Sequence, residues 1–180
     1  MDAGTVRERK VKMFKKYGEF DSAEEMNRAA EEKLKAGDTK AILGIAEENG
    51  IDKEDAEDYI DGCTSEFVTP LMAARGKLEV ESKDLEIKGI LTDWRDMILK
   101  MCMDDQKMCA AVRRKGKSLK ECMAVMLAFS FDNKTQISDK IVNATTITHN
   151  GKKVPLKGPV YMGIPNRMET REMIKKYYLG

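Results

Sequence analysis

Apolar side chains recur along this chain at spacings of three and four residues, which is the period of an amphipathic helix. The strongest such pattern begins at Asp84. Its apolar residues fall on one face and are Leu85, Ile90 (or Ile87), Trp94, Met97, Ile98, Met101 and Cys102. The segment from Leu119 to about Phe131 is apolar on nearly every side, which is typical of the central helix of a bundle. With a last helix from Met168 to Tyr178, the pattern predicts a mainly α-helical bundle.

Capping signals divide the rest of the chain into shorter helices. Ser22 stands three residues before Glu25, the spacing of a capping box, and Thr69-Pro70 has the composition of a helix start. Glycines that follow the periodic segments mark the C-terminal ends of these helices. Together these signals predict helices over residues 5–16, 22–35, 38–48, 52–61, 69–81, 104–115 and 137–144.

A short segment near the C-terminus has the pattern of β structure instead. Thr145 to Thr148 is rich in β-branched residues, and Asn150-Gly151 is the strongest short signal for a hairpin turn. Residues 154–160 and 161–164 have the composition of short extended pieces. We therefore expect a small β-hairpin near the C-terminus of the helical bundle.

Charge is distributed unevenly along the chain, although the net charge is only +1. Residues 19–66 carry sixteen acidic and five basic side chains, whereas residues 1–18 carry six basic and two acidic ones. Residues 67–180 carry 21 basic and 13 acidic side chains. We expect two parts: a basic N-terminal helix with an acidic helical subdomain over residues 1–66, and a basic, methionine-rich helical core with the hairpin and last helix over residues 67–180. Segregated charge steers association, so the pattern indicates a protein that binds charged partners.

The candidate chemistry of the chain points away from catalysis. His149 is the single histidine, and it is accompanied by no serine or cysteine pattern of the kind that a nucleophile and its base require. The four cysteines form no CxxC pair, and the acidic run at residues 52–55 lacks the glycine and glutamate of a calcium loop. The sequence contains no glycine-rich phosphate loop. We therefore expect no enzyme activity, no metal and no cofactor.

The sequence also predicts where the protein resides. It has no apolar run long enough to span a membrane, and its first sixteen residues lack the apolar core of a secretory signal. Three of the four cysteines lie among methionines in helical patterns, where reduced thiols act as small apolar side chains. We expect a cytoplasmic protein without membrane contact.

Two charged sets are the candidate partner-binding residues. The first set is acidic and consists of Asp52, Glu54, Asp55, Glu57, Asp58 and Asp61. It lies on the second helix of a pair that resembles a helix-turn-helix, but a DNA-reading helix needs positive charge, so DNA readout is rejected. The set is either a solvated face or a negative surface that meets a basic groove.

The second candidate set is basic and consists of Arg113, Arg114 and Lys117. These cations either complement the end of a helix or grip phosphates or an acidic protein surface. A further basic patch, Lys152, Lys153 and Lys157, surrounds the predicted hairpin.

Several segments resemble a known group of proteins. They are residues 89–97 (GILTDWRDM), 115–119 (KGKSL), 121–123 (ECM), 138–142 (SDKIV) and the ending from 163 to 180. Together they resemble small proteins of clostridial and related mobile elements, the PcfK-like group and neighbouring anti-CRISPR families that inhibit the type II effector nuclease. The resemblance covers roughly residues 85–180, and it is weaker in the acidic part, where it rests on residues 19–22 and 49–52.

The resemblance implies an anti-CRISPR inhibitor that acts by binding. Its partner would be a guide-loaded type II RNA-guided DNA endonuclease in the cytoplasm of a bacterial host, whose positively charged channels hold nucleic acid. An acidic helical block could occupy such a channel as a phosphate mimic and block DNA binding or cleavage, while the basic half contacts guide RNA or DNA. Two alternatives remain open. One is a plasmid-transfer accessory protein that binds nucleic acid through its basic C-terminal half, and the other is a scaffold protein without nuclease contact.

Overall fold

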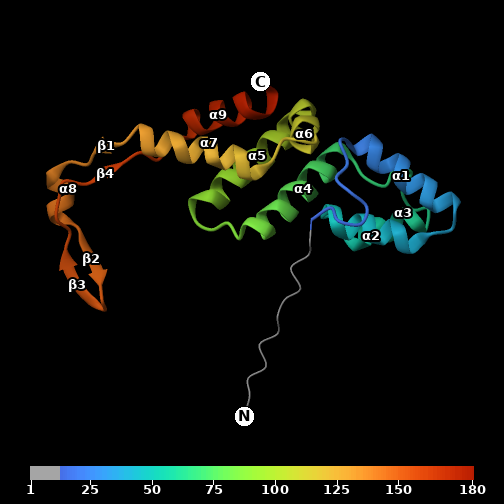
Figure 1. Ribbon diagram of the computed structural model, residues 1–180, viewed down its shortest axis with the longest axis horizontal. Coiled ribbons are helices and arrows are strands. Elements are labelled where there is room, and N and C mark those ends of the chain that lie inside the picture. Colours follow the sequence, from blue (N-terminus) through green and yellow to red (C-terminus); the bar gives the residue numbers. More distant parts are fainter. Residues whose placement is uncertain (1–12) are drawn as a thin grey trace, which may run out of the picture.

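Helices dominate residues 13–180, the part of the chain that the computed structural model describes (Figure 1). The helices are α1 (Ala23–Lys35), α2 (Thr39–Asn49), α3 (Lys53–Ile60), α4 (Pro70–Leu85), α5 (Ile90–Asp104), α6 (Gln106–Arg113), α7 (Leu119–Asp132), α8 (Asp139–Ala144) and α9 (Arg167–Leu179). The strands are β1 (Thr135–Gln136), β2 (Thr146–His149), β3 (Lys152–Pro155) and β4 (Tyr161–Met162). The prediction of a mainly α-helical fold with a small hairpin is confirmed. Most of the helix expected over residues 5–16 lies outside the described residues, and residues 13–16 form turns and bends.

The first hydrophobic cluster lies between α1, α2, α3 and the start of α4. Met26 of α1 and Ile42 of α2 are fully buried in it. Phe67 and Ala73 pack in the same cluster, so it extends past Glu66, where we expected the boundary between the two parts of the chain. The acidic helices are thus built on a core of their own, which α4 completes.

The contact between α2 and α4 depends on two glycines. Gly50 ends α2 in the left-handed conformation, with a φ of 69°. A Cβ on Gly76 of α4 would overlap the carbonyl oxygen of Asn49, and one on Gly50 would overlap the carbonyl oxygen of Gly76. Because neither residue carries a Cβ, the end of α2 lies directly against the backbone of α4.

The second hydrophobic cluster lies between α4, α5, α6, α9 and the first half of α7. Trp94, Ile98, Met126 and Tyr178 are buried at its centre. Three of the four cysteines are also buried in it and are reduced, as expected. Helix α4 contributes side chains to both clusters and therefore joins the acidic helices to the rest of the molecule.

The start of the strongest predicted helix is wrong. Helix α4 continues to Leu85, and α5 begins at Ile90 rather than at Asp84. Glu86 ends α4 in the left-handed conformation, with a φ of 50°. Because this position is usually glycine, a glutamate there gives no stop signal in the sequence.

Helix α7 is only partly the central helix that its composition predicted. Leu119 and Met126 belong to the second cluster, but Val125, Leu127 and Phe131 are exposed. The second half of α7 leaves the body of the molecule, so its apolar side chains have no neighbouring helix to cover them (Figure 1).

Residues 133–165 form a projecting arm that continues from α7 (Figure 1). Strand β1 pairs antiparallel with β4, which places Thr135 opposite Met162 and brings the two ends of the arm together. A Cβ on Gly163 would overlap the carbonyl oxygen of Ser130, so the returning chain lies directly against the end of α7. Beyond this stalk come α8 and the β2–β3 hairpin, whose turn is Asn150-Gly151 as predicted.

The molecule is elongated. The acidic helices α1, α2 and α3 lie at one end, and the hairpin of the arm lies at the other (Figure 1). The chain thus separates its acidic and basic ends in space as well as in sequence. Among residues 13–180, no helix has the length and apolar character that crossing a membrane requires.

Candidate partner-binding site

Helix α3 is held against the protein by one side and presents its acidic residues on the other. Ala56 and Tyr59 are buried, and the Tyr59 ring contacts that of Phe67 at a centroid distance of 5.6 Å. Asp52 precedes the helix as its N-cap, and Asp61 follows it as its C-cap. Because Ala56 and Tyr59 lie on the buried side of α3, the acids between them point away from the core.

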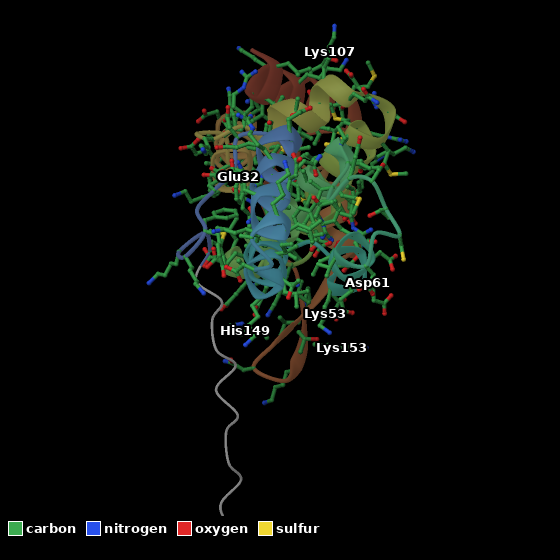
Figure 2. All side chains as sticks on the ribbon, turned by 90° about the vertical axis from the view of Figure 1, so that its right-hand side faces the viewer. Glu32, Lys53, Asp61, Lys107, His149 and Lys153 are labelled. Carbon is green, nitrogen blue, oxygen red and sulfur yellow. The ribbon has the colours of Figure 1, made fainter. Side chains whose placement is uncertain are left out.

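All six acidic residues of the first predicted set are accessible. Asp52, Glu54, Asp58 and Asp61 are exposed, and Asp55 and Glu57 are half-buried. Among the described residues, the one ion pair that any of these six acids forms is between Glu57 and Lys53, with 2.5 Å between Oε1 and Nζ. Figure 2 shows Asp61 and Lys53 at the surface of this end of the molecule. The structure thus brings the acidic set together on one helix whose charge is mostly unneutralised.

A cleft lies beside this acidic face, where the start of α3 meets α4. Asp52 and Asp55 line one side of it, and Arg75 and Lys83 of α4 line the other. Its volume is about 350 Å³. Because its walls carry both signs of charge, the cleft is suited to polar side chains of a partner rather than to an apolar ligand.

Arg113, from the second predicted set, does not lie on the surface. It is only 1% exposed, at the C-terminal end of α6. Its Nε donates to the carbonyl oxygen of Phe20 at 3.0 Å, and its Nη2 donates to Oδ1 of Asn49 at 2.5 Å. Burial lowers the pKa of Arg113 to about 10, against the opposing effect of Glu19 and Glu81. The proposed role of Arg113 as a partner-binding cation is therefore corrected, because a partner has no access to it.

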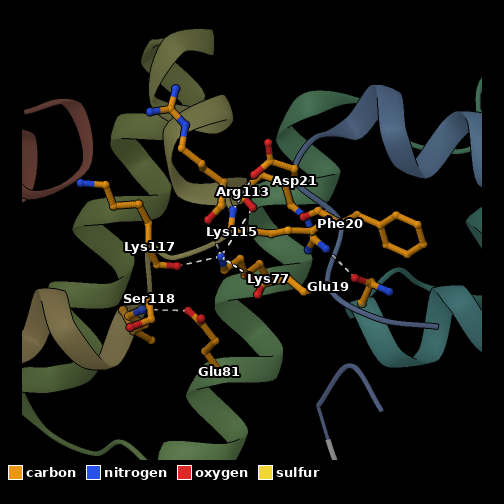
Figure 3. Close-up of polar contacts among 12 residues, drawn as sticks. Glu19, Phe20, Asp21, Lys77, Glu81, Arg113, Lys115, Lys117 and Ser118 are labelled. Carbon is orange, nitrogen blue, oxygen red and sulfur yellow. Dashed lines mark hydrogen bonds and ion pairs between the residues drawn. The ribbon is translucent and has the colours of Figure 1, made fainter. Parts of the chain in front are cut away.

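Lys77 of α4 completes this buried arrangement and is also 1% exposed (Figure 3). Its Nζ lies 2.6 Å from Oε1 of Glu19. The same Nζ donates to the carbonyl oxygens of Arg114 at 2.9 Å and Lys117 at 2.7 Å. A buried ammonium is stable only when its charge and its hydrogen bonds are satisfied, and here both are.

Two further contacts extend the network toward the surface. The backbone N–H of Lys115 donates to Oδ1 of Asp21 at 2.8 Å, and its Nζ lies 3.3 Å from Oε1 of Glu25. On the other side, Oε2 of Glu81 accepts from the backbone N–H of Leu119 at 2.9 Å. Burial raises the pKa of Glu81, while the Leu119 N–H and Lys77 act in the opposite direction.

We call these residues the polar junction: Glu19, Asp21, Glu25, Lys77, Glu81, Arg113 and Lys115. It joins the acidic N-terminal part to the α6–α7 turn (Figure 3). Part of the charge segregation in the sequence therefore serves folding, because Glu19 and Glu25 form ion pairs with lysines of residues 67–180 and Asp21 accepts a hydrogen bond from a backbone N–H of that part. The acids of α3 take no part in the junction.

The second predicted set is thus divided. Arg114 is exposed, whereas Lys117 is half-buried and donates from Nζ to the carbonyl oxygen of Tyr177 at 2.6 Å. The Nζ of Lys117 also lies 5.0 Å from the centroid of the Tyr177 ring. Of the three cations, only Arg114 is available to a partner without loss of an internal contact.

The remaining chemistry gives no second site. Among the residues that the structure describes, no cluster of three or more histidine, cysteine, aspartate or glutamate side chains is placed to hold a metal ion. Cys102, Cys109 and Cys122 are buried, and burial raises the pKa of each thiol. Cys63 is exposed at the end of α3.

Two features of the molecule were not predicted from the sequence. The first is the polar junction, whose partners lie up to 94 residues apart, so no local pattern could reveal it. The second is the projection of the arm, which was signalled only by an apolar helix followed at once by a polar, strand-like segment. Comparison with protein-family models, with curated protein sequences and with solved structures gives no match to this chain.

Proposed function

We propose that this protein is a binding inhibitor of a type II RNA-guided DNA endonuclease, as the sequence resemblance implies. The observation that supports the proposal best is the acidic face of α3, where exposed carboxylates lie on a rigid helix and are mostly unpaired. Such an array resembles the phosphates of a nucleic acid in the sign of its charge. The endonuclease holds its guide and target in positively charged channels, so it offers a complementary surface.

The shape of the molecule agrees with this mode of binding. The acidic helices lie at one end of an elongated molecule, so this end can enter a channel while the body remains outside (Figure 1). The first hydrophobic cluster holds α3 in place without the partner. A preformed surface loses little conformational entropy on association, which favours tight binding.

The test is DNA cleavage by a guide-loaded endonuclease in the presence of charge variants of this protein. The first variant neutralises the four exposed acids of α3 with Asp52→Asn, Glu54→Gln, Asp58→Asn and Asp61→Asn. The matched control removes the same charge elsewhere, with Asp84→Asn, Asp93→Asn, Asp104→Asn and Asp132→Asn, all of which are exposed. We expect the α3 variant to lose inhibition by tenfold or more and the control to inhibit as the wild type does. Equal inhibition by all three proteins would remove α3 from the binding site.

A further inference from the structure

The β2–β3 hairpin carries charge of one sign only. Residues 140–167, which include it, contain five lysine and arginine residues and no aspartate or glutamate. Lys152, Lys153 and Lys157 are exposed, and none of them forms an ion pair with a residue of 13–180. In a chain where 35% of residues are charged, this is a positively charged surface without internal compensation.

The hairpin also stands free of the body. Every residue of β2 is exposed, and in β3 only Val154 is half-buried. Figure 1 shows the hairpin beyond α8 at the far end of the arm, and Figure 2 shows His149 and Lys153 clear of the helices. Most small hairpins bury one face against a core, so a two-stranded ribbon with both faces in water has its side chains available to a partner.

The register places positive charge on both faces of the ribbon. His149 lies opposite Lys152, and Thr148 lies opposite Lys153. Because successive side chains of a strand point to opposite faces, Lys152 and Lys153 point to different sides. A flat protein surface would meet one of these cations, whereas a groove lined by phosphates on both walls would meet both.

The base of the hairpin contacts α8. Val142 of α8 is only 2% exposed, and Gly158 of the returning chain lies beside its side chain. The backbone N–H of Leu156 donates to the carbonyl oxygen of Thr145 at 2.9 Å, which continues the ladder toward α8. The base of the ribbon is therefore connected to α8 by side-chain packing and by a backbone hydrogen bond.

We propose that this hairpin binds duplex DNA by entering the major groove as a two-stranded ribbon. The major groove of B-form DNA is about 12 Å wide and about 8.5 Å deep and admits such a ribbon. Four residues per strand give the ribbon a length of roughly 13 Å, which is enough to reach the floor of the groove. Lys152 and Lys153 then face the phosphates of the two walls, and Lys157 faces the backbone beside the entrance. The partner is DNA rather than duplex RNA, because the A-form major groove is too narrow for side chains to read.

This inference goes beyond the proposed inhibition and does not depend on it. The acidic end and the basic hairpin lie at opposite ends of the molecule, so both surfaces can be occupied at once (Figure 1). The test below contains no endonuclease, so failure of one proposal leaves the other standing.

The test is fluorescence anisotropy of a labelled 20-base-pair DNA duplex titrated with the full-length protein at several salt concentrations. Three phosphate contacts predict a slope of log affinity against log salt of about −2.7, and an affinity loss of about 40-fold between 50 and 200 mM salt. The variant Lys152→Ala, Lys153→Ala, Lys157→Ala should lose about tenfold or more in affinity at 50 mM salt and should flatten the slope toward zero.

The matched control variant carries Lys88→Ala, Lys100→Ala and Lys107→Ala. These lysines are exposed on the body, and Figure 2 shows Lys107 at the opposite edge of the molecule from the hairpin. The control removes the same net charge and should bind DNA as the wild type does. Because all six lysines are exposed, both variants should retain the thermal unfolding midpoint of the wild type, which separates loss of binding from loss of fold.

Three results would overturn the proposal. The first is equal DNA affinity of the hairpin variant and the wild type. The second is duplex RNA binding as tight as duplex DNA binding, which contradicts entry into the wide groove. The third is binding of a labelled polyglutamate peptide, but not of duplex DNA, through the same lysines, which would make the hairpin a site for an acidic protein.

Discussion

The buried position of Arg113 has a direct consequence for stability. Replacement by alanine leaves the carbonyl oxygen of Phe20 and Oδ1 of Asn49 without their donors, and Asn49 is fully buried. It also removes a positive charge beside Glu19 and Glu81. A hydrogen bond to a charged group contributes about 1.5–3 kcal/mol, and breaking a buried charge network by removing one member costs about 3–5 kcal/mol. We expect Arg113→Ala to lower the free energy of unfolding by about 3–5 kcal/mol, a large part of the 5–15 kcal/mol typical of whole domains.

The neighbouring arginine is the matched control for this change. Arg114 is exposed, and the contact that the polar junction draws from it is to its backbone carbonyl, so Arg114→Ala should stay within about 0.5 kcal/mol of the wild type. Arg113→Lys keeps the charge but cannot reach both Phe20 and Asn49, and it should fall between the other two. Urea unfolding followed by far-UV circular dichroism measures all three proteins on one scale. A loss below about 1 kcal/mol for Arg113→Ala, equal to that for Arg114→Ala, would refute the polar junction as a stabilising contact.

Three further predictions follow from the same structure. Gly76→Ala places a Cβ against the carbonyl oxygen of Asn49 and should lower the thermal unfolding midpoint, because the backbones of α2 and α4 must move apart. Differential scanning calorimetry measures this midpoint, and an unchanged value would contradict the close contact between the two helices. Burial raises the pKa of Glu81, so the folded protein binds the proton of this carboxyl group more tightly than the unfolded chain does. The contribution of Glu81 to stability is therefore full below pH 4.5 and is lost as pH rises through the raised pKa. Glu81→Gln should flatten the dependence of unfolding free energy on pH in that window, and an unaltered pH profile would show that Glu81 is not buried in solution. A thiol reagent should label Cys63 rapidly and the other three cysteines only after unfolding; fast labelling of more than one thiol in the native protein would contradict the buried positions.

Local signals in the sequence were enough to predict most of the elements. Ser22 caps α1, with its Oγ accepting from the backbone N–H of Glu25 at 3.1 Å, and Thr69 caps α4 in the same way through Met72. Asn150 has the positive φ that the predicted hairpin turn requires. Such features depend on a few adjacent residues, so a single sequence contains them completely.

Features that depend on distant residues could not be predicted in this way. Arg113 looked like a surface cation at a helix end, because nothing near it in sequence shows that Phe20 and Asn49 surround it. The exposed second half of α7 has the same cause, since its composition is that of a buried helix and only the path of the arm uncovers it. Strand β1 has two residues and forms only through β4, whose residues are paired with it from 25 and 27 positions further along the chain.

The charged residues that the sequence singles out have two different uses in the structure. The accessible acids of α3 and the free lysines of the hairpin agree with surfaces for charged partners. Other charged residues of the same segments, among them Glu19, Asp21 and Lys77, form contacts within the molecule. Counting charges along a sequence does not separate these two uses, because both give the same composition.

The most direct test of the proposed function is a titration of guide-loaded type II endonuclease with the wild-type protein at low and physiological salt, with DNA cleavage as the readout. We expect inhibition to saturate near one equivalent of protein and to weaken as salt rises, because exposed charges more than about 8 Å apart are screened at physiological ionic strength. Unimpaired cleavage at a large excess of protein would contradict the proposed function.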